Sequence, residues 1–304
     1  MRRRAAALAG VALMVASVAI PAAAAHPGEN GRIAFMRLGG GYGNRPSEIF
    51  SVRADGSGLR RLTNNDQPEG VGAFSPSGRR LAFSVGGDTY DSELYVMDGR
   101  GRNRRRIVDL RGGNGSPSWS PDGDWIVFFN VRPRRRGEVF IVRPDGSGLT
   151  RLTDTPVDEL APDWSPDGDR IAVISDRGTG TSDVWTMNAR GSDFERVTRG
   201  ATVCRRGCED RYGGIDSLDW APGGNRIVFS ANKGDGPSEI WIVHESGRRL
   251  RKLAGGRHPA WSPDGRWIAY SAEGKLYKIR IDGTARRRLT NNGNDYMPDW
   301  GRKI

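Results

Sequence analysis

Histidine and cysteine are scarce in this chain, which has only three His and two Cys among 304 residues. The histidines, His26, His244 and His258, are far apart in the sequence, so a metal site built from several histidines has little support. Motifs of common catalytic sites are also missing: there is no G-x-S-x-G nucleophile elbow, no phosphate-binding P-loop, no H-E-x-x-H and no EF-hand loop. We therefore predict no catalytic residues, no metal ligands and no resident cofactor.

Long hydrophobic runs are missing too, except at the start of the chain. Residues 1–4 are charged, residues 5–20 form an apolar segment of about 16 residues, and residues 21–25 are mostly small. This order is typical of a secretory signal peptide, so we predict a leader over residues 1–25 and a secreted or periplasmic, extracytoplasmic location. An uncleaved membrane anchor is the alternative, although the apolar segment is short for a span. No Cys lies near the predicted cleavage zone, which excludes a lipid-modified anchor, and we expect no stable membrane insertion after cleavage.

What the sequence has in abundance is a repeated ten-residue pattern. Trp119-Ser-Pro-Asp-Gly-Asp-Trp-Ile-Val-Phe128 returns in similar form at Trp164 and Trp261, and looser copies begin at Phe74 and Trp220. The five starting positions are separated by 45, 45, 56 and 41 residues. Repeats of this length are typical of the blades of a β-propeller.

A sixth copy is divided between the two ends of the chain. Pro298-Asp-Trp300-Gly lies near the carboxyl terminus, and Asn30-Gly-Arg-Ile-Ala-Phe35 supplies the rest of the pattern near the amino terminus. A blade shared between the termini closes a ring of sheets and removes unpaired strand edges. We therefore predict an all-β fold, a six-bladed β-propeller of four-stranded blades over residues 26–304, closed by a blade that both ends share.

Each repeat contains strand and turn signals in the same order. The aromatic anchor begins the pattern, Ser-Pro-Asp-Gly predicts a tight turn, and an Ile-Ala-Phe-type segment predicts the second strand. A third strand, an Asp-Gly-type turn and a short fourth strand that ends in Leu-Thr or Val-Thr follow. Alternating strand directions place both sets of tight turns on one rim and the irregular connections on the other. We expect recognition on the irregular rim, because binding residues are commonly carried by loops on a rigid scaffold. The predicted third strands are 48–52, 93–97, 138–142, 183–187, 239–243 and 275–279.

This order of W-S-P-D-G-x-x-I-A-F, an I-Y-V-M-type strand, D-G-S and R-L-T resembles the repeat of TolB-type propellers. The resemblance covers nearly all of residues 30–304 and implies the six-bladed fold. Proteins similar to this family include a periplasmic envelope component, accessory domains of prolyl-oligopeptidase-like peptidases and pectin-fragment lyases, so the resemblance indicates a fold more strongly than a function. The resemblance does not extend to TolB as a whole, because we expect no separate amino-terminal α/β domain ahead of the propeller. The chain lacks residues for the α/β-hydrolase domain that carries the peptidase triad.

The chain is strongly basic, with a formal net charge of +11 that falls to +8 without the three arginines of the leader. Arginine clusters at 104–106, 134–136, 205–206 and 286–288 could bind anionic glycans, envelope phosphates or acidic partners. The alternative is that they are solvated surface residues, because they are scattered over different blades. Nucleic acid is not an expected partner of an exported chain without an aromatic-interleaved basic stripe.

Both cysteines, Cys204 and Cys208, lie in an insertion that lengthens one repeat to 56 residues. In an oxidising compartment we predict a disulfide between them that orders a long loop. A free pair or a metal-binding pair is the alternative, although the metal would need further ligands.

Three acids occupy one repeat position, immediately before the aromatic anchor: Asp163, Asp219 and Asp299. Period-2 alternation points them away from the anchor, toward the central channel if their strand is innermost. There they could hold a cation or a basic peptide terminus, or they could accept hydrogen bonds from neighbouring backbone amides. His258 and Tyr296 are expected on the same rim, where each could bind a ligand or serve packing.

Two hypotheses for function follow. The first is an exported, non-catalytic interaction module, monomeric, whose channel mouth and irregular rim bind an envelope or extracellular protein, peptide or glycan. The second is a small-molecule hydrolase or lyase that uses a divalent cation in the channel, with Asp163, Asp219 and Asp299 as ligands or bases.

Overall fold

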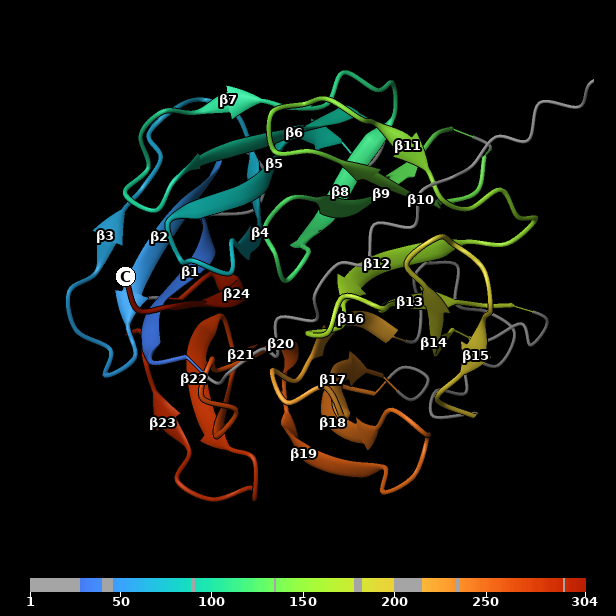
Figure 1. Cartoon of the computed structure of the whole chain (residues 1–304). Helices are drawn as coiled ribbons and strands as arrows, with labels where there is room; N and C mark the ends of the chain where they lie inside the picture. Colours follow the sequence, from blue (N-terminus) through green and yellow to red (C-terminus); the bar gives the residue numbers. More distant parts are fainter. Residues whose placement is uncertain are drawn as a thin grey trace, which may run out of the picture.

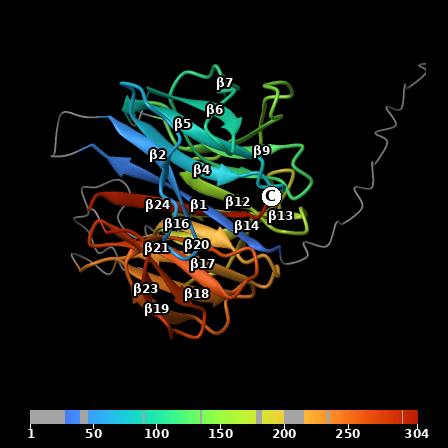
Figure 2. The ribbon, with the colours of Figure 1, turned by 90° about the vertical axis from the view of Figure 1, so that its left-hand side faces the viewer.

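The computed structural model describes residues 28–39, 46–88, 91–133, 135–177, 182–199, 215–232, 236–291 and 293–304. Over these ranges the chain forms short β-strands that are grouped into sheets around a common centre (Figures 1 and 2). The predicted leader over residues 1–25 lies outside the described residues, as do Cys204 and Cys208. None of the described segments is a helix long and apolar enough to cross a membrane.

Six blades of four strands follow one another along the chain, and the first is completed by the last strand. Blade 1 consists of β24 (Asp295–Arg302), β1 (Asn30–Leu38), β2 (Ser47–Arg53) and β3 (Arg60–Arg61). Blade 2 consists of β4 (Glu69–Phe74), β5 (Arg80–Asp88), β6 (Asp91–Asp98) and β7 (Arg105–Arg106). Blade 3 consists of β8 (Gly113–Trp119), β9 (Ile126–Val131), β10 (Glu138–Val142) and β11 (Thr150–Arg151).

The second half of the ring repeats this order. Blade 4 consists of β12 (Glu159–Trp164), β13 (Arg170–Ser175), β14 (Asp183–Asn188) and β15 (Glu195–Arg196). Blade 5 consists of β16 (Ile215–Trp220), β17 (Arg226–Ala231), β18 (Glu239–His244) and β19 (Arg251–Gly255). Blade 6 consists of β20 (Arg257–Trp261), β21 (Trp267–Ala272), β22 (Lys275–Arg280) and β23 (Arg287–Arg288). Pairing within every blade is antiparallel, and one parallel pair, Ser92 with Gly113, connects blades 2 and 3.

The prediction of a shared closing blade is confirmed. Strand β1 pairs antiparallel with β24, with Ile33 opposite Trp300 and Ala34 opposite Asp299. Figure 1 shows these blue and red strands side by side, although they come from opposite ends of the chain. The innermost strands β24, β4, β8, β12, β16 and β20 each contact the next, so they form a closed ring.

The hydrophobic core lies between neighbouring blades. Side chains of the second strands, such as Phe35, Phe83, Phe128 and Phe229, are fully buried. The aromatic anchors pack into the same layers: Trp220 of blade 5 contacts a cluster that includes residues of blade 4. Burial of large aromatic side chains at each interface joins the six sheets into one ring.

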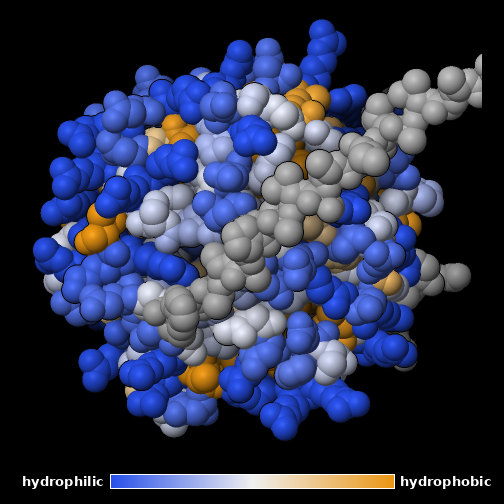
Figure 3. Space-filling model, in the orientation of Figure 1, coloured by the Kyte–Doolittle hydropathy of each residue, from blue (hydrophilic) through white to orange (hydrophobic). Residues whose placement is uncertain are grey.

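The rim that carries the tight turns has the same hydrogen bonds in most blades. In blade 4, the Ser165 hydroxyl donates to Asp167 Oδ1 at 2.5 Å and accepts from the Arg170 amide at 2.9 Å. The Ala189 amide donates to the Asp169 carbonyl, so the two kinds of tight turn lie together, as predicted. The face of the molecule in Figure 3 is mostly hydrophilic, with hydrophobic side chains in small separate groups.

Four outermost strands, β3, β11, β15 and β23, are shorter than predicted, because they end just before the Leu-Thr or Val-Thr pair. In blade 4 the Thr198 hydroxyl accepts from the Val184 amide at 2.9 Å and donates to Asp183 Oδ1 at 2.7 Å. Arg196 completes this arrangement, with Nε on the Thr198 carbonyl and Nη2 on Asp183 Oδ2 at 2.6 Å. The threonine therefore leaves the ladder to form side-chain hydrogen bonds, and many arginines of this basic chain have a structural role.

Candidate functional site

The innermost strands surround a central channel, and the repeat position before each aromatic anchor faces into it. The anchors Trp119, Trp220, Trp261 and Trp300 are buried between blades, with 5 to 6% of their surface exposed. The preceding residues line two cavities that meet at the centre of the ring, as the alternation of a strand requires. The residues at this position, in blade order from blade 2, are Ala73, Ser118, Asp163, Asp219, Ala260 and Asp299.

The three acids connect neighbouring blades. Asp163 Oδ2 accepts from the amide of Trp220 in the next blade at 2.7 Å, and its Oδ1 accepts from the Ser118 hydroxyl at 2.6 Å. Asp219 accepts from the Trp261 amide in the same way, and Asp299 accepts from the Phe74 amide at 2.8 Å. Of the roles that the sequence left open for these acids, the structure shows the one in which they accept backbone amide hydrogen bonds.

The pKa values of the three channel carboxylates are raised, because protein surrounds them and they lie near each other. Burial raises the pKa of Asp163 to about 6, against hydrogen bonds that favour its ionised form. Burial raises the pKa of Asp299 to about 7, and the charge of Asp163 contributes. The pKa of Asp219 is raised well above its usual value by burial and then by repulsion from Asp163. The ring is therefore not fully ionised at neutral pH unless a positive group enters the channel.

A cavity of about 140 Å³ forms the end of the channel on the irregular rim. Its lining includes the residue three positions before the anchor, where Ser116, Ala161, His258 and Met297 have φ angles of 45°, 45°, 52° and 51°. Non-glycine residues in this left-handed region cost conformational energy. The pairing of every innermost strand also has a register shift near this position, which indicates β-bulges around the mouth.

Sequence reasoning named His258 but missed Ser116, Ala161 and Met297, although one signal marks all four mouth residues. Proline follows each of the four strained residues, at 117, 162, 259 and 298. A proline at a fixed repeat position inside a strand is a recognised mark of a bulge, because it cannot donate to the ladder.

The opposite end of the channel is a cavity of about 250 Å³. Prolines of the tight turns, including Pro121 and Pro166, line it together with Arg302. Because both cavities include Asp163, Asp219 and Asp299, these acids lie at the neck of the channel and not at its outer mouth.

The structure brings His258 and Tyr296 together on the irregular rim. Their rings meet edge to face, with centroids 6.5 Å apart. His258 lines the channel cavity, whereas Tyr296 lines a separate groove of about 590 Å³ beside blades 5 and 6. The two residues therefore connect the channel mouth to the neighbouring groove.

Comparisons with known proteins agree with this architecture. Residues 30–207 match the family described as TolB beta propeller domain. The chain belongs to this family. No curated protein sequence matches the chain.

Several solved structures resemble the chain along most of its length. TolB from Acinetobacter baumannii is 20% identical, with a TM-score of 0.74 over 90% of this chain and 67% of that chain. A chain of a nidogen/laminin complex is 11% identical, with a TM-score of 0.67 over 89% and 98%. An oligogalacturonate lyase in complex with manganese is 15% identical, with a TM-score of 0.53 over 80% and 70%. At these identities the similarity shows the fold alone.

The neck of this TolB-type propeller does not fit a metal ion well. Within the part of the chain that the structure describes, no three His, Cys, Asp or Glu side chains lie close enough together to hold one ion. Asp163 uses both carboxylate oxygens for hydrogen bonds within the ring. The channel acids thus hold blades together, and a divalent ion would have to replace those contacts.

Proposed function

We propose that this propeller is an exported, non-catalytic interaction module that binds a partner through its channel mouth and irregular rim. The partner class that fits best is an envelope or extracellular protein or peptide that inserts a positively charged group, with a glycan as the broader alternative. The observation that carries the proposal is the ring of strained, bulged residues at the channel mouth.

Backbone strain at one position in several blades supports recognition at that place. A non-glycine residue in the left-handed region costs about 1 kcal/mol or more, and bulges commonly redirect side chains beside binding sites. Four blades keep this conformation, at Ser116, Ala161, His258 and Met297, around the same opening. Met297 is 38% exposed there, so its side chain is accessible to a partner at the mouth.

The neck carboxylates supply a reason for positive charge in the partner. Burial raises their pKa values, and repulsion from Asp163 adds to the shift at Asp219 and Asp299. A Lys, Arg or amino terminus that enters the neck would favour the ionised carboxylates. The same carboxylates are hydrogen-bonded to backbone amides, so they hold the blades in place whether or not a ligand is present.

Peptide binding by the purified protein without its leader tests this proposal. Fluorescent peptides rich in Lys and Arg, with free amino termini, are expected to bind saturably, whereas acidic peptides of equal length are not. Met297→Ala and Asp219→Asn should weaken this binding about tenfold, and Tyr296→Ala should weaken it less because Tyr296 lies beside the mouth.

Control variants lie in turns of the opposite rim. Asp122→Asn and Asp145→Asn should leave peptide binding unchanged, provided that circular dichroism shows every variant to be folded at the assay temperature. Equal loss from both rims would contradict recognition at the mouth. Metal-dependent hydrolysis or elimination that Asp219→Asn abolishes would instead favour the enzyme hypothesis.

A further inference from the structure

A further cavity, of about 510 Å³, lies on the irregular rim of blade 3 and is separate from the channel. It lies between the loop after β9 and the segment that leads from β11 to β12. Four arginines line it: Arg132, Arg135, Arg136 and Arg151. We name these four residues and the cavity between them the arginine pocket.

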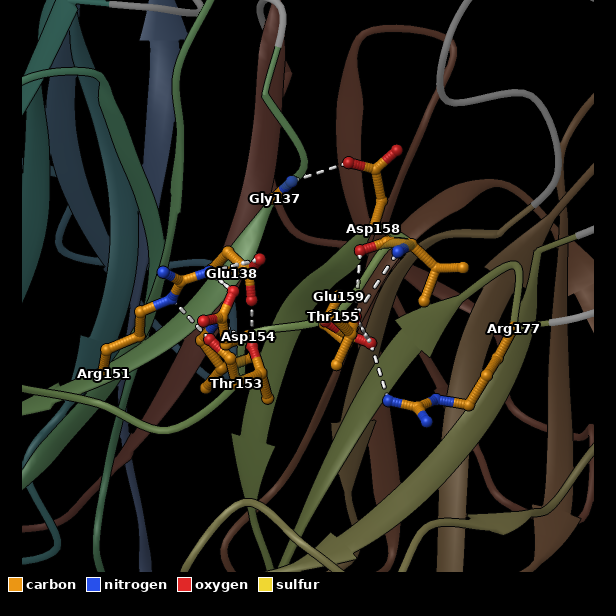
Figure 4. A network of polar contacts seen from close by, with 11 residues as sticks. Gly137, Glu138, Arg151, Thr153, Asp154, Thr155, Asp158, Glu159 and Arg177 are labelled. Atoms are coloured by element: carbon orange, nitrogen blue, oxygen red, sulfur yellow. Dashed lines mark hydrogen bonds and ion pairs between the residues drawn. The ribbon is translucent and has the colours of Figure 1, made fainter.

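Two of the four guanidinium groups are held in place by carboxylates. Arg151 Nη2 contacts Glu138 Oε1 and Asp154 Oδ1, each at 2.7 Å, and Figure 4 shows this pair of contacts beside Thr153. Arg136 Nη1 lies 3.1 Å from Asp158 Oδ2, and Asp158 also accepts from the Gly137 amide. These contacts hold the two guanidinium groups in fixed orientations, which lowers the conformational entropy lost when an anion binds.

The other two arginines are not neutralised. Arg132 uses Nε to donate to the Arg111 carbonyl at 3.1 Å, which leaves its terminal nitrogens without a partner among the described residues. The side chain of Arg135 makes no hydrogen bond or ion pair within the same described part of the chain. Three acids, Glu138, Asp154 and Asp158, lie against the four arginines, so the pocket has one positive charge in excess.

Arginines elsewhere on the same rim are paired differently. Arg37 forms two hydrogen bonds with Asp295, Arg104 contacts Glu69, and Arg177 contacts Glu159, and each of these acids is fully buried at its side chain. Those arginines complete the fold. The unpaired charge of Arg132 and Arg135 therefore is not a general property of the rim.

We propose that the arginine pocket binds a phosphate monoester. Guanidinium groups match the oxygens of a phosphate in paired hydrogen bonds. A phosphate monoester offers three acceptor oxygens to the guanidinium groups of Arg132 and Arg135, which no carboxylate among the described residues neutralises. The cavity is larger than a phosphate ion, and its wall adds Asn130, Thr155 and Phe140, so the alcohol should be about the size of a sugar. This inference rests on the proposed recognition role of the irregular rim, but it uses none of the residues of the channel.

Calorimetric titration with glucose 1-phosphate, inorganic phosphate and glucose tests the arginine pocket. Glucose 1-phosphate is expected to bind saturably, inorganic phosphate more weakly, and glucose not at all. Arg135→Ala should lower the affinity for glucose 1-phosphate about tenfold or more, because it removes a charge-assisted hydrogen bond. Arg190→Ala, an exposed arginine in a tight turn of blade 4 on the opposite rim, is the matched control and should have no effect.

A lipid headgroup could present the same chemistry, so vesicles form a separate arm. Binding to phosphatidic acid vesicles that Arg135→Ala removes, without binding of glucose 1-phosphate, would support the phosphate site and identify a membrane as its source. Equal effects of Arg135→Ala and Arg190→Ala, equal affinity for glucose, or no binding in either arm would overturn the proposal. Asp219→Asn should leave phosphate binding intact, so failure of peptide recognition at the channel is distinguishable from failure here.

Discussion

The two rims of this propeller are built from the same six repeats, yet the same residues recur from blade to blade on only one of them. On the tight-turn rim, the serine of the Ser-Pro-Asp-Gly turn is buried in four blades, at 75, 120, 165 and 262. On the irregular rim, connections differ in length and charge from blade to blade. The repeated rim holds the sheets together, and the varied rim offers sites that occur only once, such as the arginine pocket.

In blade 5 the serine and the aspartate of the tight turn are replaced together. Ala221 replaces the serine and Gly223 replaces the aspartate of the turn, so both partners of the usual hydrogen bond are lost together. The Trp220 indole instead donates to the Gly224 carbonyl at 2.9 Å. Because the serine and the aspartate are both absent, neither side chain is left without its usual partner in this turn.

The largest effect on stability is expected for β24, the strand that closes the ring. Strand β24 runs between the two rims, and Trp300 packs with Ile33 and Phe35 in the closing blade. Trp300→Ala should lower the free energy of unfolding by about 3–5 kcal/mol, and deletion of residues 296–304 should prevent cooperative folding. Denaturant unfolding followed by Trp fluorescence and circular dichroism measures both effects. Cooperative melting of the deletion variant at the parent temperature would show that the shared blade does not close the ring.

The sequence predicts this architecture because a propeller repeats its signals. Each blade has its own anchor, turns and third strand, so the strands assigned in one repeat can be checked against those of the others. The division of one copy between Asn30 and Trp300 predicted closure before any contact was known. The rims could also be assigned, because antiparallel strands alternate in direction.

The channel and the arginine pocket depend on contacts that do not repeat in sequence. Whether Asp163 faces a ligand or an amide depends on how far the next blade lies, and no local pattern gives that distance. The charge cluster around Arg135 was visible in the sequence, but its excess charge depends on which neighbours Arg136 and Arg151 find. Such pairing is a property of the assembled rim.

A smaller effect is expected from the turn serine of the tight-turn rim. Ser165 is 1% exposed, and its hydroxyl serves Asp167, the Arg170 amide and the Arg170 carbonyl. Ser165→Ala should lower the free energy of unfolding by about 2 kcal/mol, because the buried Arg170 amide loses a partner. Arg135→Ala on the irregular rim should change it by less than about 0.5 kcal/mol. Comparable losses from the two variants in urea unfolding would contradict the division of roles between the rims.

The smallest effect concerns the neck between the rims and depends on pH. Asp299 has a folded-state pKa raised to about 7, so its neutral form stabilises the fold below about pH 4, and this contribution is lost as pH rises toward 7. Asp299→Asn stays neutral and keeps an oxygen for the Phe74 amide. The variant should therefore match the parent near pH 4 and be more stable by about 1–2 kcal/mol at pH 8, a value reduced from the full shift because water reaches the channel.

Asp145 on the tight-turn rim provides the matched control with the opposite sign. Hydrogen bonds from the Ser147 side chain and amide lower the pKa of this exposed carboxyl, so its ionised form stabilises the fold above the unfolded pKa and this contribution is lost in acid. Asp145→Asn should therefore be slightly less stable than the parent at pH 8 and should approach it at low pH. Urea unfolding of both variants and the parent at pH 4, 6 and 8 separates the two signs. A stability difference for Asp299→Asn that is constant over this range would show that water, and not protein, surrounds the neck carboxylates.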